Sequence, residues 1–535
     1  EIIEINMDRE DEYGNVEYKL LLREITEDRM EQLVSQMAYR LAEGFGECIY
    51  IIGIEDDGTF TGIPEETMAK SIENLALIAK RNNSSMTKIS ENVLDNGNKI
   101  LEFYIREEID SKYIDIKVAV AGNVDSGKST LIGVLTNGKR DNGRGSARTS
   151  IFNYNHEVKS GRTSSIAHHI LGFNNTGETI NYESKRTWQD ISRDSNKIIS
   201  IFDLAGHEKY LRTTILGLSS STLDMVLIAV GANMGVTRMT KEHIFLCVVL
   251  NIPFCFVITK LDIVKDRKNV LEETIGQLKK IVKMPGIRKA LIKIKEISDI
   301  NLCIKNGECV PLFMVSNVTG EGIDSIKYFL NMVPKNKYYA TKKKSPVEYH
   351  IDTIFLVNGV GTVVGGNLKS GTVKVGDTLF LGPNSGTYVP YLIKSIHIKR
   401  TLVSQVDTNC YVCFNLKKAL KKNIRKGNVM VSLESQQLMV REFVAQVSVM
   451  RTHSTTIKVG YEPVVHVNSV RQCAKILEIF DIVSLREKDE KDTKILRNGD
   501  KAKVRFRFKF RGEYITPGMK ILLAEGKVKI VGSVV

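Results

Sequence analysis

The chain has 535 residues, 42% of them hydrophobic and 26% charged, which is typical of a soluble globular protein with three or four domains. No apolar run reaches the length of a membrane span and no secretory signal opens the sequence, so we expect a cytoplasmic protein without a membrane partner. Residues 1–112 contain 12 Lys/Arg and 25 Asp/Glu, a net charge of −13, and the rest of the chain carries +27. A body this basic indicates a polyanionic partner, with RNA expected rather than DNA; a lysine-rich solvated surface is the alternative.

The acidic segment, residues 1–112, is predicted to form a small α+β domain. Hydrophobic residues recur with helical spacing from Met30 to Leu41, and Gly44 is suited to end that helix. The other elements expected here are a strand over 48–54, a hairpin turn over 56–59 leading into another strand, a helix over 65–81 and a strand over 100–105. The segment has no catalytic constellation, so we interpret it as a binding or autoregulatory domain whose acidity shields the basic body.

Residues 113–335 alternate between strand-like and helix-like runs, which predicts an α/β domain with a mainly parallel, doubly wound sheet. Its first turn, 122–129, follows an alternating apolar strand and fits G-x-x-x-x-G-K-[ST], the P-loop pattern. Glycines let backbone N–H groups close on a polyphosphate, Lys128 adds a positive charge, and the Ser129 hydroxyl can bind Mg²⁺. The residues expected to contact the nucleotide are Asn123, Val124, Asp125, Ser126, Gly127, Lys128, Ser129 and Thr130.

Three further motifs follow in the order typical of proteins that bind guanine nucleotides. Asp203 and Gly206 end a second apolar strand, where a carboxylate can hold Mg²⁺ and a glycine N–H can approach the γ-phosphate. Asp262 can accept hydrogen bonds from N1–H and the 2-amino group of guanine, a donor pair that adenine lacks. The other residues expected at the base are Thr259, Lys260, Ser316, Asn317 and Val318. The four motifs together predict binding of GTP and GDP.

Residues 336–345 are predicted to be a linker, and two β-barrels are predicted over 346–437 and 438–535. After Pro346, helical runs almost vanish and strand-length runs recur between glycine turns. The runs expected to form strands are 353–357, 361–364, 378–381, 392–398 and 429–431. Cys410 and Cys413 fall three residues apart in a strand-like run and so face opposite sides, which favours reduced packing thiols over a zinc site.

The strongest local signal for RNA binding is the run 501–511, in which Lys and Arg alternate with Ala, Val and Phe. Strand periodicity places the basic side chains on one face, where a phosphate backbone can bind them. The residues expected to contact RNA are Lys503, Arg505, Arg507 and Lys509. The alternative is an edge strand that its charges protect from aggregation. A second basic cluster contains Lys417, Lys418, Lys421, Lys422, Arg425 and Lys426.

The motifs 122–129, 203–208 and 359–364 resemble those of the translational GTPases related to elongation factor Tu. The strings 141–145, 157–165, 204–211, 316–321 and 394–400 are similar to the subfamily of GTP-binding protein 1 and its paralogue, and the likeness runs from about Tyr18 to the C-terminus. The resemblance implies a GTPase domain followed by two barrels, and hydrolysis of GTP to GDP and phosphate.

The resemblance also implies roles for single residues. His207 occupies the position that orients the attacking water in this family. Thr163 matches the family's switch threonine, which completes the coordination of Mg²⁺ together with Ser129 and Asp203. Asp125 lies beside the phosphates, where we hypothesise that it helps hold a monovalent cation, K⁺.

The sequence departs from the wider family at two positions. Arg162 stands where isoleucine usually forms an apolar gate over the histidine, although Val124 can still form one side of that gate. We interpret Arg162 either as a solvent-exposed or RNA-contacting residue or as an arginine finger acting in cis. Thr259 stands where most GTPases have asparagine; its shorter side chain offers one donor, so a weaker contact with guanine is expected.

These observations predict a translational-type GTPase that binds aminoacyl-tRNA in its GTP form and hydrolyses GTP on the ribosome. Three alternatives remain open: a ribosome-rescue GTPase that carries a protein mimic of tRNA, an adaptor for the mRNA-decay machinery in which the nucleotide tunes partner recruitment, and a GTPase subunit of a metabolic enzyme such as one of sulfate activation.

Overall fold

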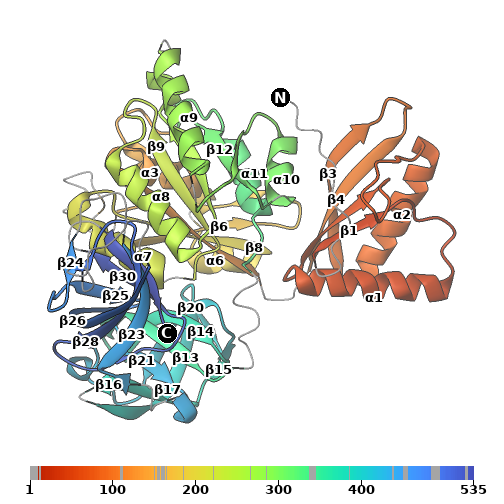
Figure 1. Ribbon diagram of the computed structural model, residues 1–535. Helices are drawn as coiled ribbons and strands as arrows, with labels where there is room; N and C mark the ends of the chain where they lie inside the picture. Colours follow the sequence, from red (N-terminus) through yellow and green to blue (C-terminus); the bar gives the residue numbers. More distant parts are fainter. Residues whose placement is uncertain are drawn as a thin grey trace.

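The structure is a computed structural model. It describes residues 10, 14–108, 113–149, 151–152, 157, 163, 166–184, 186–220, 222–265, 267–284, 286–305, 307–336, 345–384, 386–435, 439–449, 456–483, 495–524 and 528–535. A small α/β domain and two β-barrels surround a GTPase-like α/β domain, which confirms the predicted fold class (Figure 1). No helix within these ranges is both long and apolar enough to cross a membrane.

The N-terminal domain is a four-stranded sheet with the order β1-β2-β4-β3 and two helices. Its elements are β1 (Val16–Lys19), α1 (Glu27–Glu43), β2 (Glu47–Ile52), α2 (Glu65–Arg81), β3 (Ser84–Val93) and β4 (Lys99–Glu107). Thr26 caps α1 by accepting a hydrogen bond from the Arg29 N–H, and Gly44 ends the helix as predicted. The strand expected after the 56–59 turn is absent from the described residues, where Ile54 and Phe60 form only an isolated bridge. The polar, half-exposed sequence of β3 gave no strand signal.

The central domain contains an eight-stranded sheet with the order β11-β12-β10-β9-β5-β8-β6-β7, parallel except at β6 and β7. Its elements are β5 (Ile114–Gly122), α3 (Lys128–Asn137), α4 (Ser146–Thr149), β6 (Ala167–Phe173), β7 (Thr179–Ile180), η1 (Tyr182–Ser184), α6 (Trp188–Asp194), β8 (Lys197–Asp203), η2 (Glu208–Tyr210), α7 (Leu211–Ser220), β9 (Met225–Gly231), α8 (Arg238–Leu250), β10 (Phe254–Thr259), η3 (Leu261–Ile263), α9 (Lys268–Val282), β11 (Ala290–Lys293), α10 (Ile297–Lys305), β12 (Cys309–Met314) and α11 (Ile323–Met332). Helices α7, α8 and α9 cover one face of the sheet and α3, α10 and α11 the other. Apolar side chains that alternate along β5 contribute to both cores, as expected of a strand buried on both faces.

A buried charge cluster joins the N-terminal domain to the central domain. The Glu47 carboxylate accepts hydrogen bonds from Arg106 Nε at 3.0 Å and from Lys197 Nζ at 2.8 Å, and Arg106 also donates to Asn331 Oδ1 at 2.8 Å. Burial alone would raise the pKa of Glu47, but the two cations hold it below its ordinary value. Loss of one partner would leave a buried unpaired charge, so the cluster fixes the contact between the two domains. In Figure 1 the N-terminal domain lies apart from the two barrels.

The first barrel closes through the order β16-β21-β13-β14-β20-β17 and the pairing of β16 with β17, with β18 added beside β17. Its elements are β13 (Glu348–Val357), β14 (Gly361–Ser370), β15 (Val373–Lys374), β16 (Thr378–Asn384), β17 (Thr387–Ile398), β18 (Thr401–Val403), β19 (Gln405–Val406), β20 (Cys410–Leu416), η5 (Lys421–Asn423), β21 (Val429–Val431) and η6 (Leu433–Ser435). All five strand runs expected from the sequence lie inside these strands.

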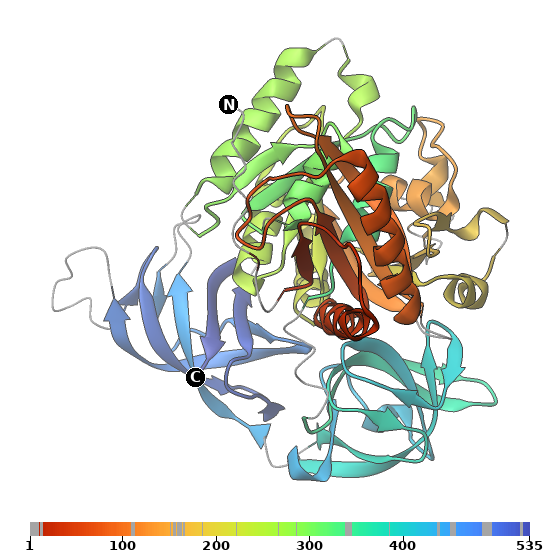
Figure 2. The same cartoon turned by 90° about the vertical axis from the view of Figure 1, so that its right-hand side faces the viewer.

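The second barrel is the closed ring β23-β28-β26-β25-β30-β31. The elements of this part of the chain are β22 (Met439–Val440), β23 (Glu442–Val449), β24 (Ile457–Lys458), β25 (Val464–Val467), β26 (Val470–Val483), β27 (Ile495–Leu496), β28 (Lys501–Phe508), β29 (Glu513–Tyr514), β30 (Lys520–Ala524) and β31 (Val528–Val534). Figure 2 shows the two barrels side by side below the central domain.

Polar contacts hold both barrels to the central domain. Lys399, in the turn after β17, donates from Nζ to Asp115 Oδ1 at 2.8 Å and to Ser200 Oγ at 2.7 Å, so the first barrel contacts β5 and β8. The second barrel contacts α7, where Ser219 Oγ donates to the Asn468 carbonyl at 3.2 Å. Its Leu522 is part of the hydrophobic core around α7 and α8.

Candidate nucleotide-binding site

The phosphate-binding loop connects β5 to α3 in the geometry that the sequence predicts. Asp125 and Gly127 adopt positive φ angles of 57° and 77°, which turns the chain sharply into the helix. Lys128 Nζ is buried and donates to the Asn123 carbonyl at 2.6 Å. Burial lowers the pKa of Lys128 to about 8, against the opposing effect of Asp203 and Asp125. The loop thus holds a buried ammonium group in a position where the negative charge of a polyphosphate would stabilise its protonated form.

Gly206 lies so close to the P-loop that no larger residue fits. A Cβ atom there would meet Lys128 Nζ at 2.5 Å and the Gly122 carbonyl oxygen at 2.6 Å. At Gly206 the segment after β8 therefore approaches the P-loop through its backbone. An N–H group at this distance from the phosphate cleft can report whether a γ-phosphate is bound.

Side chains of the three residues assigned to Mg²⁺ meet at the N-terminal end of α3. Ser129 Oγ donates to Asp203 Oδ2 at 2.6 Å, Thr163 Oγ1 donates to the same oxygen at 3.0 Å, and the two hydroxyls lie 2.9 Å apart. Asp203 Oδ1 is buried and has no hydrogen-bond partner in the described part of the chain. Burial raises the pKa of Asp203. Hard oxygen ligands with one buried acceptor left over fit Mg²⁺.

His207 lines the same cleft as the P-loop and Thr163. Its Nδ1 accepts a hydrogen bond from the Lys209 N–H at 3.1 Å, which also caps the short helix η2. In the neutral ring the proton must then be on Nε2, so that nitrogen is a donor. With its proton on Nε2, the neutral imidazole can donate a hydrogen bond from that nitrogen but cannot accept one there.

The base-binding residues converge from β10 and β12, which are adjacent strands. Ser316 Oγ donates to Asp262 Oδ1 at 2.5 Å and accepts the backbone N–H of Thr319 at 3.1 Å. Ser316 therefore fixes the orientation of the carboxylate predicted to read guanine. Lys260 adopts a positive φ of 63° at the start of η3, and Val318 is exposed where the loop leaves Asn317.

Thr259 is fully buried, and its hydroxyl donates to the Ser126 carbonyl at 2.7 Å. The single donor of the side chain is thus used by the P-loop and not by a base. Asn317 is also close to the P-loop, because its Nδ2 lies 3.6 Å from the position of a Cβ on Gly127. The residues predicted to bind the base therefore lie against the P-loop. The hydrogen bond from Thr259 to the P-loop could not be predicted from its position in the sequence.

The predicted basic stripe lies on β28, except for Lys509 just beyond its end, and alternate residues of β28 are buried and exposed as expected. The alternative of an edge strand is wrong, because β28 pairs with both β23 and β26. Each predicted RNA contact also has a carboxylate neighbour. The ion pairs are Lys503–Asp481 at 2.8 Å, Arg505–Glu478 at 3.4 Å, Arg507–Glu442 at 2.5 Å and Lys509–Glu462 at 2.7 Å.

The second basic cluster differs from the stripe in this respect. Lys417, Lys418, Lys421, Lys422 and Lys426 are exposed, and none forms an ion pair with a carboxylate within the described ranges. Arg425 is paired with Glu513 at 2.6 Å. We call the first four of these lysines, 417, 418, 421 and 422, the lysine cluster.

One cleft residue was missed from the sequence. Arg148, on the short helix α4, lines the phosphate cleft with the P-loop, Thr163, Gly206 and His207. Arg148 does not follow a strand and belongs to no recognised motif. Residues 141–145, which resemble the subfamily of GTP-binding protein 1, lie just before it in the chain. Arg162, considered as an arginine finger, lies outside the described residues, as do positions 337–344 of the predicted linker.

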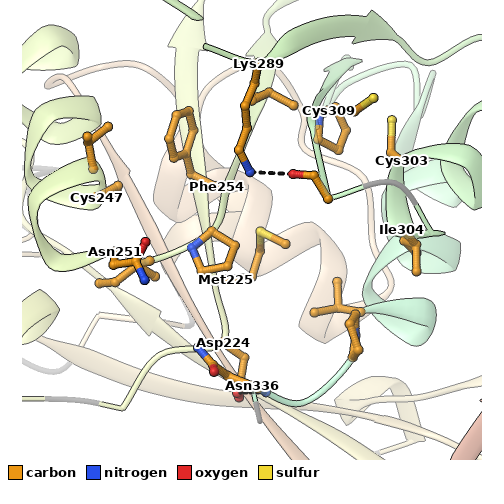
Figure 3. Close-up of a pocket in the computed structure, with 18 of the residues that line it drawn as sticks. Asp224, Met225, Cys247, Asn251, Phe254, Lys289, Cys303, Ile304, Cys309 and Asn336 are labelled. Atoms are coloured by element: carbon orange, nitrogen blue, oxygen red, sulfur yellow. Dashed lines mark hydrogen bonds between the residues drawn. The ribbon is translucent and has the colours of Figure 1, made fainter. Parts of the chain in front are cut away.

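A larger cavity, of about 450 Å³, lies at the opposite edge of the sheet. Figure 3 shows Met225, Phe254, Cys303 and Cys309 at its wall and Asp224 and Asn336 at its lower margin in this view. Met225, Phe254 and Cys309 begin β9, β10 and β12, Cys303 is on α10 and Asn336 follows α11, whereas the nucleotide motifs follow the ends of the parallel strands. The cavity is therefore separate from the phosphate cleft.

Comparisons with known proteins agree with this site. Residues 115–374 match the family model described as the elongation factor Tu GTP binding domain. GTP-binding protein 2 from Homo sapiens is 40% identical over 98% of this chain and 87% of its own length. Elongation factor 1-alpha from Methanopyrus kandleri is 27% identical over 73% of this chain and 89% of its own length. The fold is similar to that of the bacterial selenocysteine-specific elongation factor EF-Sec, with a TM-score of 0.55 and 20% identity over 79% of this chain and 58% of that chain.

Proposed function

Since the chain belongs to the family of GTPases with an elongation factor Tu GTP binding domain, in the group of GTP-binding proteins 1 and 2, we propose that it couples GTP hydrolysis to the release of an RNA ligand. The chain is a translational-type GTPase that hydrolyses GTP. The proposed ligand is aminoacyl-tRNA, bound in the GTP form, and the proposed trigger of hydrolysis is the ribosome, which would place the protein in the cytoplasm.

The observation that carries this proposal is a continuous path from the phosphate cleft to the second barrel. His207 caps η2, and η2 runs directly into α7. Near the end of α7, Ser219 contacts Asn468 in the turn between β25 and β26. A shift of the segment around Gly206 and His207 on loss of the γ-phosphate would therefore move α7 against the barrel. Such a mechanical link is what a nucleotide-dependent RNA-binding surface needs.

In the proposed cycle, each group in the cleft has a distinct task. Lys128 and the P-loop N–H groups bind the phosphates, and Gly206 and Thr163 sense the γ-phosphate through close contact. Ser129, Thr163 and Asp203 would hold Mg²⁺, which when bound neutralises phosphate charge. His207 orients the attacking water through its Nε2–H. Asp262, fixed by Ser316, selects guanine. We also propose that Asp125 helps hold K⁺ beside the phosphates.

The test is binding of aminoacyl-tRNA and deacylated tRNA to the protein loaded with a non-hydrolysable GTP analogue or with GDP, at one fixed salt concentration. We expect tight binding only for aminoacyl-tRNA with the GTP-analogue form, at least about 10-fold tighter than any other combination, which is a coupling free energy of roughly 1.4 kcal/mol. Fluorescence anisotropy of labelled tRNA measures all four constants.

Equal, weak binding in all four combinations would overturn the delivery role. Ribosome-stimulated GTP hydrolysis retained in that case would favour ribosome rescue with a protein mimic of tRNA. If neither tRNA nor ribosomes affect the protein, a role as an mRNA-decay adaptor would be favoured instead.

We propose that RNA contacts the basic faces of both barrels, and that the lysine cluster contributes more than the β28 stripe. A lysine without a carboxylate neighbour can bind a phosphate directly, whereas Lys503, Arg505, Arg507 and Lys509 must first give up an ion pair. Changing all four residues of the lysine cluster to Gln is expected to reduce the slope of log affinity against log salt by about 3. The same change at the four stripe residues is expected to reduce it less. A larger loss from the stripe variant would reverse this assignment.

A further inference from the structure

We propose that Arg148 is a catalytic arginine supplied by the chain itself, which donates hydrogen bonds to the β- and γ-phosphate oxygens of GTP during hydrolysis. Arg148 lines the cleft together with Lys128, Thr163, Gly206 and His207. These residues belong to the P-loop and to the two segments that read the γ-phosphate. A guanidinium group in this cleft therefore lies beside the phosphates whose charge changes in the reaction.

Arg148 is half-buried, and its guanidinium has no carboxylate partner in the described part of the chain. Guanidinium groups are permanently charged and match phosphate oxygens with two parallel N–H donors. Lys128, the other basic side chain lining this cleft, is assigned to the phosphates through the P-loop, so Arg148 adds a second positive charge to the cleft. Its chemistry and its surroundings both indicate an anionic ligand.

The loop before Arg148 is built to hold this side chain in place. The Asp141 carboxylate accepts the backbone N–H groups of Gly143 at 2.9 Å, Gly145 at 3.1 Å and Ala147 at 2.9 Å. The Asp141 N–H in turn donates to the Asn317 carbonyl at 2.9 Å, which ties the loop to the base-binding segment. The Asp141 side chain therefore stabilises the conformation of the loop, and the Asp141 N–H attaches the loop to the nucleotide site.

Two glycines leave the space that this arrangement needs. A Cβ atom on Gly145 would lie 2.5 Å from Arg148 Nε and 3.0 Å from its Cζ, so the guanidinium passes directly over Gly145. A Cβ atom on Gly133 of α3 would lie 2.0 Å from the Ala147 carbonyl oxygen. The close packing of α4 on α3, the helix that begins at Lys128, sets the distance of Arg148 from the P-loop.

The chemistry of the step is balanced without any further reactant. The water oxygen forms a bond to Pγ, the bond from Pγ to the bridging oxygen breaks, and its electron pair remains on the β-phosphate of GDP. The protons of the water leave with inorganic phosphate. Charge builds up on the bridging and γ-phosphoryl oxygens as that bond breaks, and a fixed cation there stabilises the transition state more than the ground state.

The test uses the full chain and compares Arg148→Ala, Arg148→Lys and Arg144→Ala. Arg144 is the matched control, because it lies in the same loop but is exposed and does not line the cleft. We expect Arg148→Ala to slow single-turnover GTP hydrolysis about 100-fold, the loss typical of one transition-state donor. Arg148→Lys should fall between, since it keeps the charge but not the paired donors. Arg144→Ala should behave as the unmodified chain does.

Two further readouts separate catalysis from a structural role. Affinity for GDP should change less than about 3-fold in every variant, whereas binding of GDP with aluminium fluoride, which imitates the transferring phosphoryl group, should be lost in Arg148→Ala. The proposal is overturned if Arg148→Ala hydrolyses GTP as fast as Arg144→Ala. It is also overturned if its loss of activity is matched by an equal loss of GDP affinity. The experiment contains no tRNA or ribosome, so its result is independent of the proposed RNA ligand.

Discussion

His207→Ala is expected to slow GTP hydrolysis about 10²- to 10³-fold while GTP and GDP affinities stay within about 3-fold, the range that a positioned imidazole contributes. The ring lines the cleft, and its Nδ1 accepts the Lys209 N–H, which leaves the Nε2–H of the neutral ring as the donor for the proposed attacking water. Because this contact matters in the transition state and not for nucleotide binding, kcat should fall without a matching change in KM. Single-turnover hydrolysis and equilibrium binding of a fluorescent nucleotide measure the two effects.

Glu208→Ala is the matched control for this variant. Glu208 is the next residue, is exposed, and pairs with Arg238 on α8 at 3.1 Å without lining the cleft. Exposed ion pairs contribute little, so hydrolysis should change less than about 3-fold. His207→Gln keeps a side-chain N–H donor and should recover part of the lost rate. Full activity in His207→Ala would mean that another group orients the water.

The convergence of the four motifs was predictable because each motif is local in sequence and the fold brings their positions together. Each motif follows one strand of a parallel sheet, and the carboxyl ends of parallel strands meet at one edge. The strands that precede the motifs, β5, β8, β10 and β12, lie on both sides of β9 in a single sheet. A turn residue at the end of any of them therefore reaches the same cleft, whatever the loops between them contain.

Contacts that depend on pairing between distant segments were not predictable in this way. The carboxylates that neighbour the β28 stripe come from β23, β26 and nearby loops, and only the register of the barrel places Glu442 beside Arg507. The bond from Thr259 to the P-loop spans 133 residues. The position of Arg148 in the cleft depends on the packing of α4 against Gly133, and Arg148 does not follow a strand whose end would have predicted that position. Sequence periodicity predicts which residues share one face of a helix or strand, but not which other element packs against that face.

The N-terminal domain shows the same limit. Its helices were predicted because their hydrophobic spacing is regular, and α2 spans the expected residues. Its contact with the central domain depends on Glu47, Arg106 and Lys197, which are buried together although they lie far apart in the chain. Isolated charged residues in a sequence are most simply interpreted as solvated, so a buried cluster of this kind becomes visible only in the folded structure.

Asp262→Asn is expected to change the base preference from guanine to xanthine. The Asp262 carboxylate accepts from two guanine donors, and an amide in its place turns one acceptor into a donor that opposes the 2-amino group. The loss of one hydrogen bond to a charged group, together with the 2-amino donor left unpaired, amounts to about 2.5–6 kcal/mol, or roughly 10²- to 10⁴-fold in Kd for GDP. Xanthine has an oxygen at position 2, which accepts from the new amide, so XDP affinity should rise. Competition of GDP and XDP against a fluorescent nucleotide measures both changes.

The environment of Asp262 makes this exchange possible without unfolding the loop. Ser316 Oγ donates to Asp262 Oδ1 at 2.5 Å, and an asparagine amide oxygen can accept the same hydrogen bond. Thr259 is used by the P-loop, so Asp262 has no side chain of the usual asparagine type to support base selection from that position. Replacement of Asp262 should therefore change base specificity more completely than in a GTPase where an asparagine at position 259 also supports base recognition. Asp324→Asn, on the exposed first turn of α11, is the control and should leave both affinities unchanged. Unaltered GDP affinity in Asp262→Asn would mean that guanine is read by other groups.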